Sequence, residues 1–345
     1  MRSSVYKGEK MRVIHVSGAM LSGKTWVCEP YCDNPNVAYW SMSEFYEERK
    51  VIVNNKMDWD RWDQEKNNIL PDLKCFVDKN QDKKVCIIES GTNATVNAFT
   101  NEIVDLVPIQ LRTPDNETIK ARAKERGLDL DVVLEFNKVF QRRHAHNDKH
   151  QYSQAEASLM LKAHIEGVRV SIIGSAGRKE DASKMDKGLY LDMFKKAYSF
   201  LDRYHLLNTA ALVSGGAAYA DHLAVSLYLN DSVPELKLYL PSRFDVTESK
   251  FFGYPDSKYA NYYHREFSLK MGGNTMLGIS KAIAKGAETE VVMGFKNRNL
   301  EVAKCDLMIA FTFGPGNKPK ERSGTLHTWN NSNAPIKIHV PLGEL

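Results

Sequence analysis

The sequence has no long hydrophobic run and little net charge. No apolar run reaches the ~18 residues that cross a bilayer, and the first ten residues carry charges and no apolar stretch. We therefore expect neither a signal peptide nor a membrane anchor, and a cytoplasmic protein without membrane contacts. The 47 basic residues exceed the 43 acidic residues by four, so charge alone gives no argument for nucleic-acid binding.

Cysteines are few as well. The five cysteines are odd in number and scattered, and two of them lie in apolar runs typical of buried strands. They are expected to be free thiols in a reducing compartment. The sequence also lacks low-complexity segments and a short repeat. With 26% charged and 43% hydrophobic residues it has the composition of an ordinary globular protein, and 345 residues are enough for two domains.

Short apolar strands alternate with helical segments along the chain. In the first part we expect strands at residues 11–16, 37–40, 85–88 and 103–111, and a long charged helical stretch after Pro114. After the polar segment 147–154 the pattern restarts, with strands expected at 168–173, 210–213, 236–240, 306–311 and 336–340. This order predicts an α/β fold of two three-layer domains, each a mainly parallel sheet flanked by helices. The predicted domains are residues 1–147 and 166–345, joined by a linker and a helix at 148–165.

A glycine-rich turn follows the first predicted strand. Residues 18–25 read Gly-x-x-x-x-Gly-Lys-Thr between a strand and a helix, which is the context that a P-loop requires. Gly18 and Gly23 let backbone N–H groups curl around phosphates, and Lys24 reaches the β and γ oxygens. Thr25 supplies a hydroxyl for Mg²⁺. The sequence therefore predicts a site for ATP and Mg²⁺, with Ser22 among the loop residues that bind the nucleotide.

Over residues 11–145 the chain resembles the P-loop kinases of nucleosides and nucleotides. The buried run 85–88, closed by Glu89, is similar to their Walker B strand. The resemblance implies that Glu89 orients Mg²⁺ or its water, or accepts the proton of the acceptor hydroxyl. A strand-end carboxylate that faces solvent is the alternative.

Residues 109–114, followed by Arg122 and Arg126, resemble the strand and lid helix of these kinases, in which arginines close over the transferred phosphoryl group. A spacing of four puts the two arginines on one helix face, and guanidinium groups suit the charge of the transition state. Arg142 and Arg143 could join them. A solvated charged helix is the alternative.

The segment between the second strand and Glu89 lies where such kinases build the acceptor pocket. The candidate residues in it are Trp40, Ser41, Glu44, Arg49, Trp59, Arg61 and Trp62. A tryptophan face can stack on a nucleobase, and an arginine can hold an acceptor phosphate. Equally, residues 58–62 can form an amphipathic packing helix. The acceptor therefore stays open among a nucleotide, a nucleoside and a modified base in DNA.

The second part of the chain carries its own glycine-rich turns. The series at residues 174–178, 214–221, 295–299 and 323–325 resembles the Rossmann-like superfamily of the cytokinin-activating phosphoribohydrolases and the DNA-processing protein A family. Such turns lie at the carboxyl ends of strands, where small residues let backbone amides approach a phosphate. Arg298 could pair with that phosphate, and Asp221 or Glu301 could polarise a ribose hydroxyl or assist glycosidic cleavage. The expected nucleotide-binding residues are Gly174, Ser175, Gly177, Arg178, Gly215, Gly216, Asp221, Arg298, Gly324 and Thr325.

Two functions stay open for the second domain. The hydrolases of that superfamily carry a Pro-Gly-Gly-x-Gly-Thr loop with a following glutamate, whereas this chain has no glutamate three residues after Thr325. This departure counts against N-glycoside hydrolysis and favours binding alone, as a nucleotide sensor that gates the kinase. An aromatic insertion at 251–263 is expected to form a lid or a subunit interface, the latter giving a homo-oligomer. The combination suggests nucleotide metabolism and would suit a bacteriophage or another virus.

Overall fold

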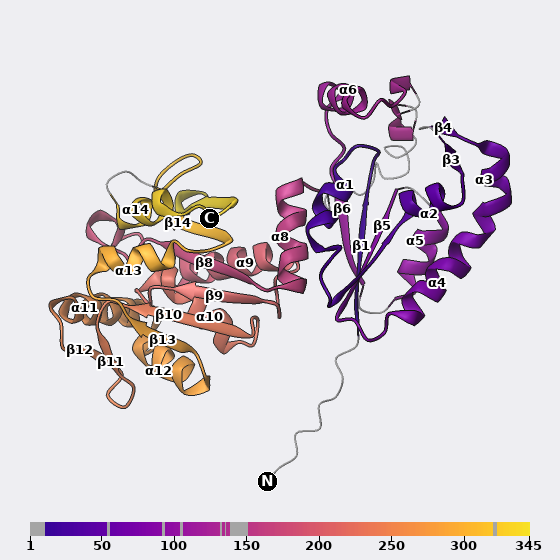
Figure 1. Cartoon of the computed structure of the whole chain (residues 1–345). Coiled ribbons are helices and arrows are strands. Elements are labelled where there is room, and N and C mark those ends of the chain that lie inside the picture. Colours follow the sequence, from indigo (N-terminus) through magenta and orange to yellow (C-terminus); the bar gives the residue numbers. More distant parts are fainter. Residues whose placement is uncertain are drawn as a thin grey trace, which may run out of the picture. The chain divides into compact units, whose positions relative to one another are not determined.

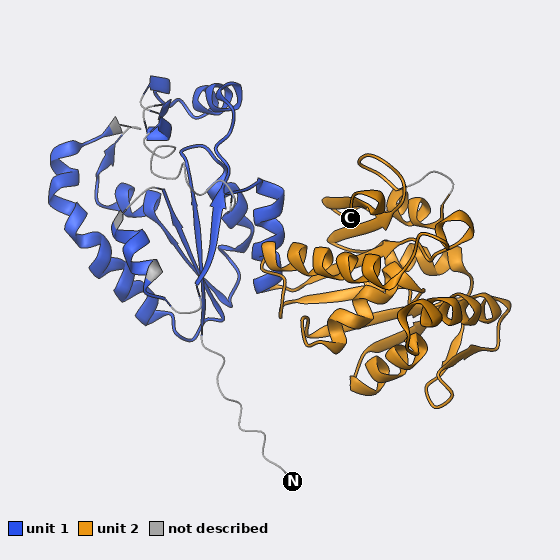
Figure 2. Cartoon of the chain, turned by 180° about the vertical axis from the view of Figure 1, so that it is seen from behind, with its two compact units in different colours: residues 1–165 blue, residues 166–345 orange. Residues whose placement is uncertain are grey.

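A computed structural model describes residues 11–53, 56–91, 94–103, 106–131, 133–134, 136–138, 151–319 and 323–345. The chain divides into two compact units, residues 1–165 and 166–345 (Figures 1 and 2). The main sheet of each unit is parallel and flanked by helices, so the predicted two-domain α/β fold is confirmed. None of the described helices is long and apolar enough to span a membrane.

Unit 1 is built around a five-stranded parallel sheet in the order β2-β5-β1-β6-β7. Its strands are β1 (Arg12–Gly18), β2 (Val37–Ser41), β5 (Val85–Ser90), β6 (Leu106–Leu111) and β7 (Gln151–Tyr152). All residues of β5 are buried, as expected of a strand covered on both faces. The central strand β1 ends at the glycine-rich turn, which therefore lies in the middle of the carboxyl edge of the sheet.

Helices cover this sheet, and two of them start at aspartate caps. The helices are α1 (Lys24–Cys28), α2 (Met42–Glu48), α3 (Trp59–Glu65), α4 (Ile69–Lys79), α5 (Ala94–Asn101), α6 (Asn116–Glu125) and α8 (Gln154–Ile165). A small antiparallel hairpin, β3 (Ile52–Val53) and β4 (Lys56–Met57), precedes α3. Asp58 and Asp115 accept hydrogen bonds from backbone N–H groups in the first turns of α3 and α6, which satisfies donors that a helix start leaves unpaired.

Residues 151–165, which we expected to lie in a linker and a separate helix, belong to unit 1. The N–H of Arg112 donates to the carbonyl of Tyr152 at 2.8 Å, which extends the pairing of β6 with β7. Helix α8 packs against α1 and buries Leu159, Met160 and Leu161. Within the polar segment 147–154, β7 is a strand of only two residues, which is too short to show an alternating apolar pattern in the sequence.

Unit 2 contains a six-stranded parallel sheet in the order β13-β10-β9-β8-β14-β15. The strands are β8 (Val168–Gly174), β9 (Ala210–Ser214), β10 (Glu235–Leu240), β13 (Glu288–Val291), β14 (Leu307–Thr312) and β15 (Ile336–Pro341). Strands β8, β9, β10 and β13 follow one another across the sheet in one direction, and β14 then pairs with the other side of β8. This reversal is the point where parallel α/β sheets open a ligand crevice. Strand β13 was not among the predicted strands, because its four residues are exposed at the sheet edge and lack an apolar run.

Several helices of unit 2 begin at or near its glycine-rich turns. The helices of this unit are α9 (Lys187–Arg203), α10 (His222–Leu229), α11 (Pro255–Met271), α12 (Thr275–Lys285), α13 (Phe295–Val302) and α14 (Gly324–Asn331). The aromatic insertion at 251–263 begins in β12 (Lys250–Phe252), which pairs antiparallel with β11 (Arg243–Asp245), and ends within α11.

Candidate functional sites

The glycine-rich turn of unit 1 joins β1 to α1 and needs both of its glycines. Gly23 has φ 95°, a left-handed conformation that glycine adopts without steric cost. A Cβ on Gly23 would lie 1.7 Å from the side-chain nitrogen of Gln154, and one on Gly18 would lie 2.5 Å from Ser22 Oγ. The backbone can therefore take this tight path only without side chains at these two positions.

Lys24 begins α1 and lies inside the curve of the turn. Its Nζ donates to the carbonyls of Gly18 and Ala19 at 3.2 and 3.0 Å. Burial lowers the pKa of Lys24, whereas the nearby carboxylate of Glu89 acts in the opposite direction. The structure thus combines a cation with the start of a helix at the centre of the sheet edge, an arrangement suited to an anion.

Glu89, at the end of β5, faces Thr25. Thr25 Oγ1 donates to Glu89 Oε1 at 3.0 Å, and the hydroxyl of Tyr39 on β2 donates to Oε2. Glu89 is only 2% exposed, so it is not a strand-end carboxylate facing solvent. Because the Thr25 proton points to Glu89, the lone pairs of the Thr25 oxygen remain for a cation. No pattern in the sequence indicates Tyr39, because its position beside Glu89 depends on the strand order.

Thr25 and Glu89 fit a magnesium ion that is also bound by nucleotide phosphates. Within the described ranges, no group of three or more His, Cys, Asp and Glu side chains could hold a metal ion. A hydroxyl and one carboxylate are instead the few protein groups that Mg²⁺ typically takes at phosphate-transfer sites. Burial and the Glu89 carboxylate raise the pKa of Tyr39, so its hydroxyl stays protonated and keeps Glu89 in place.

The two predicted lid arginines occupy the end of α6. Arg122 is half-buried, and its Nη1 donates to the carbonyl of Leu21 in the turn at 2.6 Å. Arg126 is exposed; it influences Lys24 through its charge, in the direction of a lower pKa. Arg122 therefore contacts the turn directly, whereas Arg126 acts over a longer distance. Arg142 and Arg143 lie outside the described residues.

The side chains considered for an acceptor pocket make structural contacts. Trp40 is 6% exposed, packs in the core and donates from its ring nitrogen to Asp72 at 3.2 Å. Arg49 forms ion pairs with Glu65 and Asp72 at 3.1 and 3.3 Å. Trp62 packs edge-on against Tyr46. Trp40, Arg49 and Trp62 are therefore engaged in packing and ion pairs, whereas Trp59, on the same helix as Trp62, is 59% exposed.

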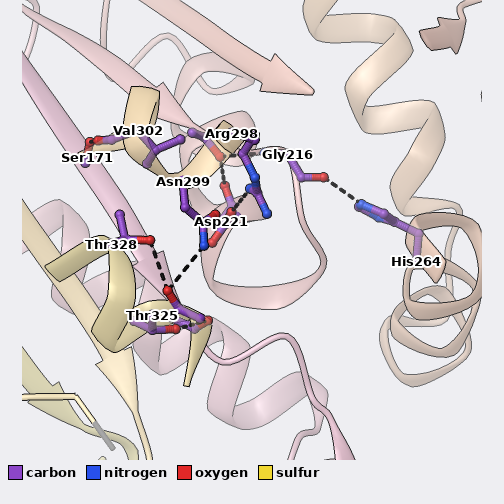
Figure 3. A network of polar contacts seen from close by, with 12 residues as sticks. Ser171, Gly216, Asp221, His264, Arg298, Asn299, Val302, Thr325 and Thr328 are labelled. Atoms are coloured by element: carbon purple, nitrogen blue, oxygen red, sulfur yellow. Dashed lines mark hydrogen bonds and ion pairs between the residues drawn. The ribbon is translucent and has the colours of Figure 1, made fainter. Parts of the chain in front are cut away.

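In unit 2 the predicted turns meet at the carboxyl ends of β8, β9 and β14. A Cβ on Gly174 would lie 2.1 Å from the carbonyl oxygen of Phe311, so β8 and β14 approach closely here. Thr325, in the first turn of α14, donates to the carbonyl of Gly174 at 2.9 Å. Asn299 on α13 donates to the carbonyl of Gly324 at 3.2 Å (Figure 3). These contacts bring the predicted segments 174, 298–299 and 324–325 together.

A buried ion pair lies beneath the turn after β9. Arg298 Nη1 and Asp221 Oδ2 are 2.9 Å apart, and the two residues are 5% and 7% exposed (Figure 3). Burial raises the pKa of Asp221, and the guanidinium of Arg298 counteracts this shift. A Cβ on Gly215 would lie 1.2 Å from Arg298 Nη1, so the guanidinium lies directly against this glycine. Arg298 Nε has no hydrogen-bond partner within the described part of the chain.

The backbone amides expected to hold a phosphate in unit 2 already donate to the protein itself. The N–H of Gly216 donates to Ser214 Oγ at 3.1 Å, and that of Gly177 donates to Ser175 Oγ at 3.3 Å. Ser175 Oγ in turn donates to Asp181 at 3.1 Å. These two N–H groups are thus used within the protein, so an anion at this crevice would have to bind through other groups of the predicted turns.

Helix α11 forms one wall of the crevice, next to Arg178. The Arg178 guanidinium lies over the rings of Tyr263 and Phe295, 4.7 and 5.4 Å from their centroids. A pocket is lined by these three residues together with Gly216, His264 and Arg298, among others. The aromatic insertion thus lines the crevice, as expected of a lid.

His264 is a pocket residue for which the sequence offered no partner. Its Nε2 lies 2.9 Å from the carbonyl oxygen of Gly216, and its Nδ1 lies 3.1 Å from Thr275 Oγ1. Because a carbonyl only accepts, Nε2 carries the proton and Nδ1 accepts from Thr275. Burial lowers the pKa of His264 to about 4, so the ring is neutral near pH 7.

Fold and sites together define an α/β protein of two parallel-sheet units, each with a candidate anion site at the carboxyl edge of its sheet. No protein-family model matches the chain. Uncharacterized protein R261 of Acanthamoeba polyphaga mimivirus is 35% identical over 181 residues, which are 51% of this chain and 96% of that protein. The chain belongs to the same family as this mimivirus protein.

Among solved structures, a chain in the structure of the Pnkp1/Rnl/Hen1 RNA repair complex aligns over 98% of both chains. The TM-score is 0.33 and the sequence identity is 9%. This similarity is too low to indicate a shared fold or function.

Proposed function

We propose that unit 1 is an ATP- and Mg²⁺-dependent phosphotransferase that acts on a nucleotide, a nucleoside or a modified base in DNA. The observation that carries this proposal is the group formed by Lys24, Thr25 and Glu89 around the glycine-rich turn. The turn and Lys24 would hold the donor phosphates, and Thr25 with Glu89 would hold Mg²⁺. When bound, the metal neutralises charge on the phosphate oxygens.

Arg122 and Arg126 would stabilise the negative charge that develops during transfer. A guanidinium offers five N–H donors in a rigid fork, and Arg122 uses one nitrogen for the carbonyl of Leu21. Arg122 can therefore hold the turn and still donate to an equatorial phosphoryl oxygen. Arg126, which is exposed, would have to approach the phosphates when the substrate binds.

A screen with labelled ATP tests this function. Nucleosides, nucleoside monophosphates and DNA are offered as acceptors in the presence of Mg²⁺, and transfer of the γ-phosphoryl group is measured. Lys24→Met should lower transfer at least 100-fold, since one charged donor to the transition state commonly contributes that much. Lys79→Met, an exposed change in α4, should leave it unchanged. Full transfer by Lys24→Met would overturn the proposal.

For unit 2 we propose nucleotide binding without cleavage, as a sensor. One observation supports it: Asp221 is buried and paired with Arg298, so this acid is already engaged within the protein. Glu301 forms only a surface ion pair with Lys304, at 2.8 Å. The alternative is N-glycoside hydrolysis, which incubation with nucleoside monophosphates and chromatography for free base would detect. Release of base by the wild type, and its loss in Asp221→Asn, would establish the hydrolase instead.

A further inference from the structure

Three consecutive carbonyl groups of the glycine-rich turn each accept a hydrogen bond from a side chain far away in the sequence. Asn137 Nδ2 donates to Met20 at 3.4 Å, Arg122 Nη1 donates to Leu21 at 2.6 Å, and Gln154 Nε2 donates to Ser22 at 3.0 Å. Donors from three separate segments therefore hold these carbonyl groups of the turn.

The bond from Gln154 fixes the direction of one peptide group. In a planar trans peptide the carbonyl of one residue and the N–H of the next point in opposite directions. Because the Ser22 carbonyl points to Gln154, the N–H of Gly23 points away from Gln154. A peptide group next to glycine can rotate at little cost, so a contact from outside the turn is needed to fix its orientation.

Gln154 also fills the space that a side chain at position 23 would need. A Cβ on Gly23 would lie 1.7 Å from its Nε2 and 2.7 Å from its Cδ. The amide group thus lies against the Gly23 backbone and limits its movement.

The chain around Gln154 is itself held firmly. Gln154 is the first residue of α8, and a reciprocal capping pair flanks it: the N–H of Ser153 donates to Glu156 Oε2 at 2.7 Å, and the N–H of Glu156 donates to Ser153 Oγ at 3.3 Å. Just before it, β7 is hydrogen-bonded to the end of β6. The position from which the Gln154 side chain extends is therefore well fixed.

We infer that Gln154 is a positioning residue of the phosphate-binding turn, which keeps the N–H of Gly23 directed at a bound phosphate. This inference rests on the proposed function of unit 1. It predicts that Gln154 contributes to the binding of any polyphosphate chain, whatever base or acceptor is attached to it.

The test compares Gln154→Met with wild type in the full-length chain. Methionine keeps most of the volume and removes the donor. The affinities for Mg²⁺-ATP and for inorganic tripolyphosphate are measured by calorimetry, and each should fall about tenfold, the effect of one ordinary hydrogen bond. The thermal unfolding midpoint should stay within a few degrees of wild type. Gln81→Met is the control, because Gln81 also donates to a backbone carbonyl, that of Val77, but lies at the exposed end of α4.

The outcomes separate the inference from the function on which it rests. If wild type binds neither probe, the phosphate-binding function of unit 1 itself fails. If wild type binds both probes and Gln154→Met binds them equally well, the positioning role is overturned while the function stands. Should Gln154→Met not fold, Gln154→Glu replaces it. Glutamate has the shape of glutamine but presents an acceptor to the Ser22 carbonyl, so affinity should fall more than tenfold; unchanged affinity would overturn the inference.

Discussion

Glu89→Gln is the substitution that best separates the roles open to this carboxylate. In the structure Glu89 accepts one hydrogen bond from Thr25 and one from Tyr39. Glutamine preserves the size of the side chain but has a single oxygen, so one of the two hydroxyls would face an NH₂ group. The substitution also removes the negative charge that would help to hold Mg²⁺.

The expected loss follows from these two changes. A hydrogen bond to a charged group is worth about 1.5–3 kcal/mol, and the lost attraction for the metal adds to it. A total of about 3–4 kcal/mol corresponds to a 100- to 1,000-fold lower rate of phosphoryl transfer. Tyr39→Phe removes one hydrogen bond and keeps the carboxylate charge, so its loss should be smaller; about 1.5 kcal/mol, the lower end of that range, corresponds to about tenfold.

Transfer from labelled ATP is measured for both variants over a range of Mg²⁺ concentrations and pH. If Glu89 orients the metal, part of the loss in Glu89→Gln should be recovered at high Mg²⁺. If Glu89 is instead the general base, added Mg²⁺ should recover nothing and the acidic limb of the pH–rate profile should disappear. Full activity of Glu89→Gln, or an equally large loss in Tyr39→Phe, would refute the reasoning.

Three further substitutions test other parts of the structure. Gly23→Ala should weaken ATP binding more than tenfold, because its Cβ would meet Gln154 at a φ of 95°; Gly127→Ala, also at positive φ but in open space, is the calorimetric control. Asp221→Ala should destabilise the protein by about 3–5 kcal/mol, since it leaves Arg298 buried and unpaired. The double variant Asp221→Leu with Arg298→Met should recover most of that loss in thermal unfolding; no recovery would contradict a pairwise origin. Burial lowers the pKa of His264 from 6.5 to about 4, so the unfolded chain takes up the proton first as pH falls. Burial also lowers the pKa of the neighbouring His222, to about 3, so both histidines contribute to the decline. Stability should be full above about pH 6.5, and at pH 5 each histidine should lower it by about 2 kcal/mol in urea titrations. His264→Gln should therefore remove about half of the decline.

The fold could be predicted from the sequence where its signals are local. The apolar runs of β1, β5, β8 and β14 are buried strands, and the glycine-rich turns predicted after β1 and β8 begin where these two strands end. Strands β7 and β13 escaped prediction for physical reasons, since one is two residues long and the other is exposed along its whole length. Pairing with a neighbouring strand, and not their own composition, makes them strands.

In the candidate site, too, residues that belong to a local motif could be predicted and residues brought in by the fold could not. Lys24 and Thr25 follow from a motif of eight neighbouring residues, whereas Gln154 reaches the turn from another part of the chain. No pattern within a few residues of Gln154 indicates that its amide meets Ser22. Only the pairing of β7 with β6, which fixes the start of α8 beside the turn, brings this contact about.

Tyr39 and Trp40 show why the sequence could not indicate which aromatic residue contacts the candidate site. They are neighbours on β2, and successive side chains of a strand point to opposite faces of the sheet. Trp40 packs with Cys86 and Ile88 in the core, which leaves Tyr39 on the face of Glu89. The strand order β2-β5-β1 decides which face of the sheet carries the candidate site, because it puts Glu89 between Tyr39 and Thr25. Strand order arises from contacts across the whole sheet, so the size of an aromatic ring in the sequence could not indicate which of the two touches the site.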